Sequence, residues 1–231
     1  MQILFKDDII ICINKPHGLI VHSTSIAQDV NQHALQLLRN QIGSHVYPVH
    51  RLDRKTAGAL LFALNSQTNS IMQQQFMNQQ VEKTYHAIVR GHTPDAGTID
   101  YPLMNEKAKK QDAVTSYKTL QRVELPISSG KFNTSRYSLV EIMPLTGRMH
   151  QIRKHFAHIF HPIIGDRPYG CNKQNRIFLQ HWNHSVMLLH AFRLVFQHPH
   201  SHQQLIIEAP HMPEFAKIAT KLGFVLKGFF G

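Results

Sequence analysis

The chain has 231 residues, of which 42% are hydrophobic and 17% charged, and this composition indicates a globular protein and excludes a disordered one. Its 25 Lys and Arg against 14 Asp and Glu give a formal net charge of +11, so a polyanion is the first partner to consider. Charge alone leaves open a nucleic acid, an anionic membrane surface or no anionic ligand.

The two cysteines, Cys12 and Cys171, lie far apart without a Cys-x-x-Cys partner, which excludes a disulfide framework and a zinc knuckle. No apolar stretch reaches the roughly 18 residues of a membrane span, and acidic residues interrupt the N-terminus before a signal core could form. We therefore expect a cytoplasmic protein without a membrane partner.

In chain order, the hydrophobic pattern alternates between the periods of strands and helices. Expected strands cover residues 3–5, 9–13, 59–64, 83–89, 116–125, 137–143, 186–196 and 203–208. Expected helices cover residues 30–42, 66–78, 150–160 and 213–223. The second helix has Ser66 as its expected N-cap and Ile71, Met72 and Phe76 on its inner face. Residues 106–112 are expected to form a solvated basic loop, with RNA contact as the alternative. The alternation, without a linker or repeat, predicts one mixed α/β or α+β domain over residues 1–231.

Residues 50–58, His-Arg-Leu-Asp-Arg-Lys-Thr-Ala-Gly, place one carboxylate among three cations and directly before an apolar run. The carboxylate is Asp53, and its charged neighbours are Arg51, Arg54 and Lys55. The apolar run is typical of a buried strand, so Asp53 would lie at the edge of that strand, fixed and partly desolvated. From these residues alone, Asp53 is either a catalytic acid or part of a loop with solvated ions.

Two later segments carry further candidates. Tyr85 lies in an expected strand, where a half-buried core aromatic is the simpler interpretation. Residues 146–155 run Thr-Gly-Arg-Met-His-Gln-Ile-Arg-Lys-His and have helical spacing in their second half. The cations of this segment are Arg148, Arg153 and Lys154, and a basic, solvated helix face is the alternative interpretation for all three.

Together with residues 161–166, these segments resemble, in order, the signatures of the RluA branch of pseudouridine synthases. Residues 50–58 are similar to His-Arg-Leu-Asp-x-x-Thr-Ser-Gly, with Ala57 in the place of Ser. The resemblance extends over nearly the whole chain and implies an α+β fold. That fold is a single catalytic domain with a mixed, mainly antiparallel sheet, flanking helices and a central RNA-binding cleft. We interpret residues 161–166 and 188–191 as architectural, with His190 as a core histidine.

The resemblance also implies roles for individual residues. Asp53 would be the essential carboxylate, acting as a nucleophile or as the base that removes a sugar proton. Tyr85 would pack against the flipped target base, and Arg153 would orient the acid. Phosphates would be bound by Arg51, Arg54, Lys55, Arg148 and Lys154. No cofactor and no metal are implied.

The resemblance implies that the substrate is tRNA and that uridine 65 is the residue isomerised. One member of the branch, which modifies tRNA, is similar to this chain in residues 123–126 and 134–141 and in lacking an N-terminal RNA-binding appendage. Ribosomal RNA, another tRNA site, and an RNA-binding protein of the same fold without activity are the alternatives. A third hypothesis is a histidine-rich metal hydrolase, which would lose its activity when a chelator removes the metal. Its best ligands would be the alternating histidines of residues 198–202, but Pro199 and the lack of an acidic or Cys partner disfavour a metal there.

Overall fold

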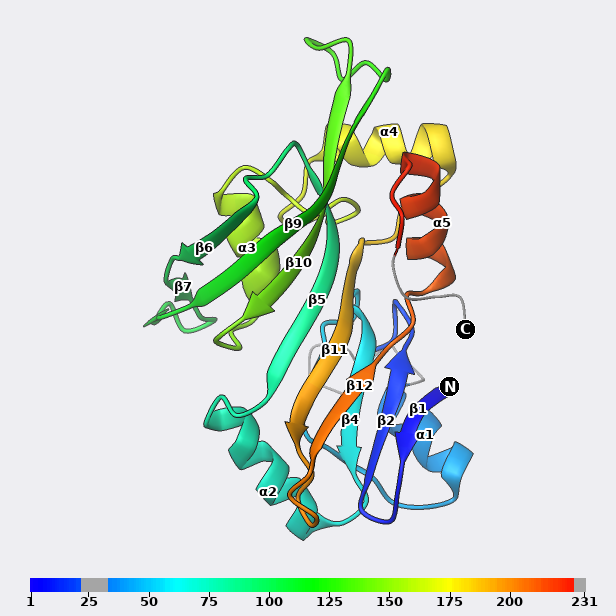
Figure 1. Cartoon of the computed structure of the whole chain (residues 1–231), viewed down its shortest axis with the longest axis vertical. Coiled ribbons are helices and arrows are strands. Elements are labelled where there is room, and N and C mark those ends of the chain that lie inside the picture. Colours follow the sequence, from blue (N-terminus) through cyan, green and yellow to red (C-terminus); the bar gives the residue numbers. More distant parts are fainter. Residues whose placement is uncertain (22–32, 227–231) are drawn as a thin grey trace. The chain divides into compact units, whose positions relative to one another are not determined.

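The structure is a computed structural model that describes residues 1–21 and 33–226 (Figure 1). The chain forms two compact units. Unit 1 comprises Met1–Lys83 and Ala191–Pro210, and unit 2 comprises Thr84–His190 and His211–Gly231. The single domain over residues 1–231 stays a prediction.

Unit 1 is built on a sheet whose central strands are buried on both faces. Its strands are β1 (Gln2–Lys6), β2 (Ile10–Lys15), β3 (Tyr47–Pro48), β4 (Ala57–Ala63), β11 (Leu189–Gln197) and β12 (Gln204–Glu208). The pairs β1–β2, β2–β4, β3–β4 and β11–β12 are antiparallel. Every residue of β2 and β4 is buried, which explains why β4 and the first four residues of β2 are apolar without alternation.

Two helices accompany this sheet. The helix α1 (Ala34–Ile42) ends at Gly43, and α2 (Ser66–Met77) begins after Asn65. The side chain of Asn65 accepts the N–H of Thr68 at 2.8 Å, so the expected N-cap at Ser66 is wrong by one residue. Met72 lies in the unit 1 core as predicted, whereas Ile71 is 37% exposed and was wrongly placed on the inner face. Residues 30–32 of the expected first helix lie outside the described residues.

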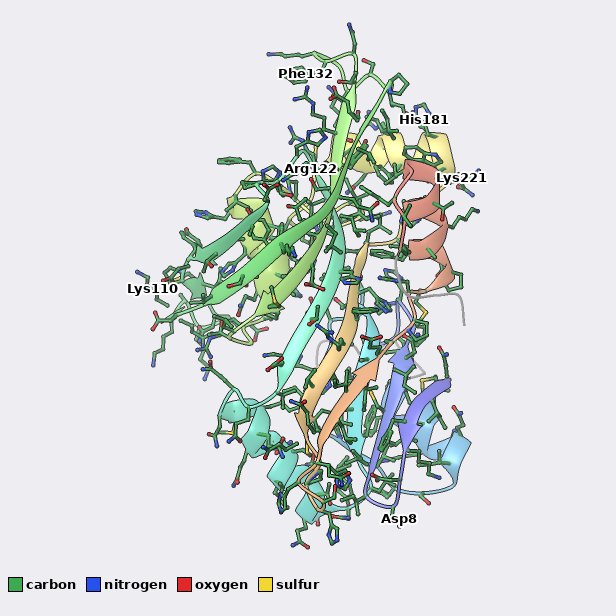
Figure 2. The ribbon with its side chains drawn as sticks, viewed as in Figure 1. Asp8, Lys110, Arg122, Phe132, His181 and Lys221 are labelled. Carbon is green, nitrogen blue, oxygen red and sulfur yellow. The ribbon has the colours of Figure 1, made fainter. Side chains whose placement is uncertain are left out.

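The long strands of unit 2 pair in the order β5-β10-β9-β6, and each of these pairs is antiparallel. These strands are β5 (Glu82–Arg90), β6 (Ala96–Asp100), β9 (Val114–Leu125) and β10 (Ser135–Pro144). The predicted β9–β10 pair is confirmed. A separate two-stranded ribbon pairs β7 (Leu103–Met104) with β8 (Lys110–Gln111), so the solvated loop expected at residues 106–112 is wrong for its last part. Figure 2 shows Lys110 on this ribbon and Arg122 on β9, both exposed.

Three helices complete unit 2: α3 (Gln151–His158), α4 (Asn172–Trp182) and α5 (Pro213–Leu222). Ile152 and Phe156 of α3 are buried against residues of β5, β9 and β10. A second core cluster contains residues of α4 and α5, and Figure 1 shows α4 crossing near the upper end of α5. The prediction that the last helix begins at Pro213 and stops at Gly223 is confirmed, whereas β6, β7 and α4 were not predicted.

Candidate active site

Asp53 lies in a tight turn directly before β4. The carbonyl oxygen of Asp53 accepts the N–H of Thr56 at 3.0 Å, which closes the turn over Arg54 and Lys55. The turn enters β4 through Gly58, whose φ is +116° and where a Cβ atom would lie 2.2 Å from the carbonyl oxygen of Ala191. Because only glycine fits there, the last residue of the motif sets how the turn meets the strand. Asp53 is half-buried, as predicted for the edge of a buried strand.

A buried cation that sequence reasoning missed supports this turn. Lys15, at the end of β2, is 0% exposed, and its Nζ donates to the carbonyl oxygens of Leu19 at 2.7 Å, Pro16 at 3.1 Å and Arg54 at 3.4 Å. Three acceptors match the three N–H groups of an ammonium, whereas a neutral amine has two. Burial lowers the pKa of Lys15 to about 7, and the charge of Asp53 opposes this shift. The only sequence signal was a lysine at the end of an apolar run, before a proline.

Arg54 forms a second link between the turn and the segment after β2. Its Nε donates to the carbonyl oxygen of Gly18 at 3.0 Å, and the N–H of Gly18 donates to the carbonyl oxygen of Arg54 at 2.8 Å. The structure shows that Arg54 holds the Asp53 turn, and its predicted binding of RNA stays a prediction. Arg51 is exposed and Lys55 half-buried, and their contact with RNA stays a prediction.

His50 fastens the other side of the motif to β4. Its Nε2 accepts the N–H of Leu61 at 3.1 Å, and its ring stacks on Phe76 with 4.6 Å between centroids. Burial of the ring and the charge of Lys83 lower the pKa of His50 to about 3, against the raising effect of a hydrogen bond with the Arg51 backbone. His50 is therefore a neutral acceptor near pH 7, and it joins the segment before Asp53 to β4.

Tyr85 belongs to unit 2, where it lies on β5 opposite Ile142 of β10. It is half-buried and packs against the core cluster that contains Phe156. This agrees with the interpretation of Tyr85 as a half-buried core aromatic. Its contact with a target base stays a prediction.

Arg153 lies in α3 of unit 2 and is only 4% exposed, so the alternative of a solvated helix face is wrong for this residue. Its guanidinium pairs with Asp166 through two hydrogen bonds, Nε to Oδ2 at 2.8 Å and Nη2 to Oδ1 at 2.9 Å. The segment of Asp166 was interpreted as architectural, and the structure places it beside a candidate site residue. The predicted pairing of Arg153 with Asp53 stays a prediction.

Arg148 and Lys154, the other predicted cations of this segment, reach the β7–β8 ribbon. Arg148 Nε donates to the carbonyl oxygen of Asp112 at 3.0 Å, and Lys154 Nζ to that of Met104 at 3.4 Å. They therefore support a ribbon whose turn and second strand carry three further lysines, Lys107, Lys109 and Lys110. RNA binding by Arg148 and Lys154 stays a prediction.

The histidine run has a structural role in its turn. His198 Nε2 bonds to Asp7 Oδ2 at 2.8 Å, and its Nδ1 accepts the N–H of Ser201 at 3.0 Å, so this histidine does have an acidic partner. Within residues 1–21 and 33–226, no group of three or more His, Cys, Asp or Glu is arranged to hold a metal ion. His190 is buried, as predicted. None of the helices in the described part of the chain is long and apolar enough to cross a membrane.

Comparison with known proteins identifies the class. Residues 9–158, which include Asp53, Tyr85 and Arg153, match the model of the RNA pseudouridylate synthases, and this chain belongs to that family. The predicted family and α+β fold class are thereby confirmed, while the central cleft stays a prediction.

Named relatives extend the similarity along the chain. The tRNA pseudouridine synthase C of Vibrio cholerae is 46% identical over 220 residues, covering 90% of both proteins. The protein of that name from Haemophilus ducreyi is 43% identical, covering 100% of this chain and 99% of its own. Among solved structures, human RNA pseudouridylate synthase domain containing 4 has a TM-score of 0.75 at 25% identity, covering 98% of this chain and 95% of that one.

Proposed function

We propose that this chain isomerises uridine to pseudouridine in tRNA, at uridine 65, with Asp53 as the essential carboxylate. The observation that carries the proposal is the similarity, over 90% or more of both chains, to proteins named tRNA pseudouridine synthase C. The net charge of +11 supports a polyanionic substrate, and a tRNA substrate implies that the enzyme acts in the cytoplasm.

The reaction needs only groups that a protein can supply. The N1–C1′ bond of uridine breaks, the uracil turns, and a C5–C1′ bond forms, with the proton lost from C5 balanced by the proton gained at N1. In the proposal, Asp53 either attacks as a nucleophile or removes and later returns a sugar proton. The base must leave the stack first, so Tyr85 is assigned to its face.

The Asp53 turn suits this role because it is held on both sides. Lys15 and Arg54 link the backbone after β2 to the turn, and the His50 ring, three residues before Asp53, bonds to the backbone of β4. A carboxylate held in this way starts close to its reactive position, which reduces the reorganisation that the reaction requires. An RNA-binding protein without activity has no need of an acid that would repel its ligand.

The test is release of tritium from tRNA labelled at C5 of its uridines. Asp53→Asn keeps the shape of the side chain and should abolish release, while filter binding of tRNA persists because phosphate contacts supply affinity. Asp8→Asn is the matched control, since Asp8 is exposed in the β1–β2 turn (Figure 2) and should leave release unchanged. Wild-type release by Asp53→Asn would refute the assignment of the acid.

The target uridine is tested separately, with tRNA in which uridine 65 is replaced by cytidine. Loss of tritium release supports uridine 65, and undiminished release would overturn that site while the reaction class stands. Activity on ribosomal RNA with none on tRNA would overturn the assignment of tRNA as the substrate. Release should also survive EDTA, because the proposal uses no metal, and a loss that added zinc restores would contradict it.

A further inference from the structure

The buried pair of Arg153 and Asp166 is part of a larger support around one guanidinium. The carboxylate of Asp166 is 1% exposed and takes the edge formed by Nε and Nη2, at 2.8 and 2.9 Å. Two parallel charge-assisted bonds determine the plane of the guanidinium as well as its position. Asp166 therefore does more than neutralise Arg153, because it sets the direction in which the side chain points.

Asp166 is itself held from α4. The Nδ2 of Asn175 donates to the carbonyl oxygen of Asp166 at 2.8 Å, and the Oδ1 of Asn175 accepts the N–H of Gly165 at 2.8 Å. A Cβ atom at Gly170 would lie 1.8 Å from the same carbonyl oxygen, so the backbone there approaches as only glycine allows. The loop that carries Asp166 is thus fixed before its carboxylate meets Arg153.

A third contact joins the guanidinium to an aromatic ring. The Cζ of Arg153 lies 5.0 Å from the centroid of the Tyr169 ring, within the range of a cation–π interaction. The hydroxyl of Tyr169 lies 3.1 Å from Nδ1 of His150, the residue directly before α3. The guanidinium is therefore held by two residues of the 166–169 loop, through hydrogen bonds with Asp166 and through the ring of Tyr169.

We propose that Asp166 and Tyr169 are positioning residues that hold Arg153 in the orientation it needs during turnover. This inference rests on the proposed function, in which Arg153 orients the essential acid. Orientation of a reacting group has to be accurate to about half an ångström, and such accuracy requires a second layer of packed and hydrogen-bonded residues. Binding of tRNA depends on phosphate contacts elsewhere, so the inference predicts an effect on kcat with little effect on KM.

Tyr169 gives the cleaner test because it is half-buried, and its variants should fold. Tyr169→Leu removes the aromatic face and should lower kcat about threefold to thirtyfold, with KM for tRNA changed less than twofold. Tyr169→Phe keeps the ring and should lose less than Tyr169→Leu. The matched control is Tyr47→Leu, which removes a half-buried tyrosine from β3 and should leave kcat unchanged.

Asp166→Asn keeps the shape of the carboxylate and should lower kcat about tenfold or more, because both charge-assisted bonds weaken. It leaves a buried guanidinium without its counter-charge, so its folded fraction is measured first by circular dichroism. A second measurement does not require the Asp166→Asn variant to fold. With Arg153→Lys as the background, Tyr169→Leu should reduce kcat less than twofold further, because the oriented fork is already gone.

Equal losses from Tyr169→Leu in the wild-type and Arg153→Lys backgrounds would indicate a merely structural role and overturn the inference. A wild-type kcat in Tyr169→Leu would do the same. Neither result affects the proposed function, which is tested separately by tritium release from C5-labelled tRNA with the wild-type protein and with Asp53→Asn.

Discussion

The buried ammonium of Lys15 makes a quantitative prediction about stability and pH. Burial lowers its pKa in the folded chain to about 7, while the value in the unfolded chain is near 10.5. Between these values the unfolded chain binds more protons than the folded chain, so unfolding takes up a proton and stability rises with pH. Lys15→Met removes this group and therefore removes its share of the pH dependence.

The size of the effect follows from the two pKa values. Integration of proton uptake from pH 6 to pH 9 gives a gain of about 2 to 3 kcal/mol for the wild type relative to Lys15→Met. The gain is small below pH 7, where Lys15 is protonated in both states, and approaches about 1.4 kcal/mol per pH unit above it. Other titrating groups are shared by both proteins and cancel in the difference.

The assay is urea unfolding at 25 °C at pH 6, 7, 8 and 9 for the wild type and Lys15→Met. Lys6→Met is the matched control, because Lys6 of β1 is exposed and its loss should leave the curve of stability against pH parallel to that of the wild type. If the Lys15→Met curve were also parallel to the wild type, Lys15 would have an ordinary pKa in the folded chain and the reasoning would be wrong.

Three further predictions concern the surface, the backbone and the buried histidines. Affinity for tRNA should fall about a hundredfold between roughly 50 and 200 mM salt if about four phosphates are neutralised, and a flat response in filter binding would contradict this. Phe160 is 84% exposed with a φ of +63°, so Phe160→Gly should raise the free energy of unfolding by about 1 kcal/mol in urea titrations. Phe160→Ala keeps the Cβ atom, which is strained at positive φ, so its free energy of unfolding should rise less than that of Phe160→Gly. Burial, with nearby His190 and His86, lowers the pKa of His211 to about 2, so unfolding takes up a proton below about pH 6. His211→Phe should therefore flatten the loss of stability between pH 6 and pH 5 in urea titrations.

Elements with one strong pattern were predicted from the sequence within a few residues. The buried run of β4 and the helix α5, with Pro213 at its start and Gly223 after its end, are examples. The helix α4 was missed because its buried residues, Gln174, Ile177 and Phe178, stand among Asn, Lys, Gln and Arg, which hide the apolar face. The strands β7 and β8 have two residues each, which is one period of a strand and too short for the alternation to be recognised.

The candidate site shows a similar limit. The motif around Asp53 and the arginine at position 153 could be found from residue types and order, because both are local. Their supports could not be found, since Lys15 donates to a carbonyl oxygen 39 residues away and Arg153 pairs with a carboxylate 13 residues away. A sequence shows where a charge stands but not which acceptor the fold brings to it. For that reason Lys15 was overlooked and Asp166 was interpreted as architectural.

The buried cations Lys15 and Arg153 differ in how their charge is offset, and we infer that they therefore have different roles. Lys15 is bound by three carbonyl oxygens, which carry no net charge, so it presents a full positive charge to Asp53 when protonated. Arg153 is bound by a carboxylate, so the pair that it forms with Asp166 is neutral as a whole. In the proposed mechanism Lys15 therefore adds its positive charge to the cations around Asp53 in unit 1, and Arg153 supplies direction through its planar fork more than net charge.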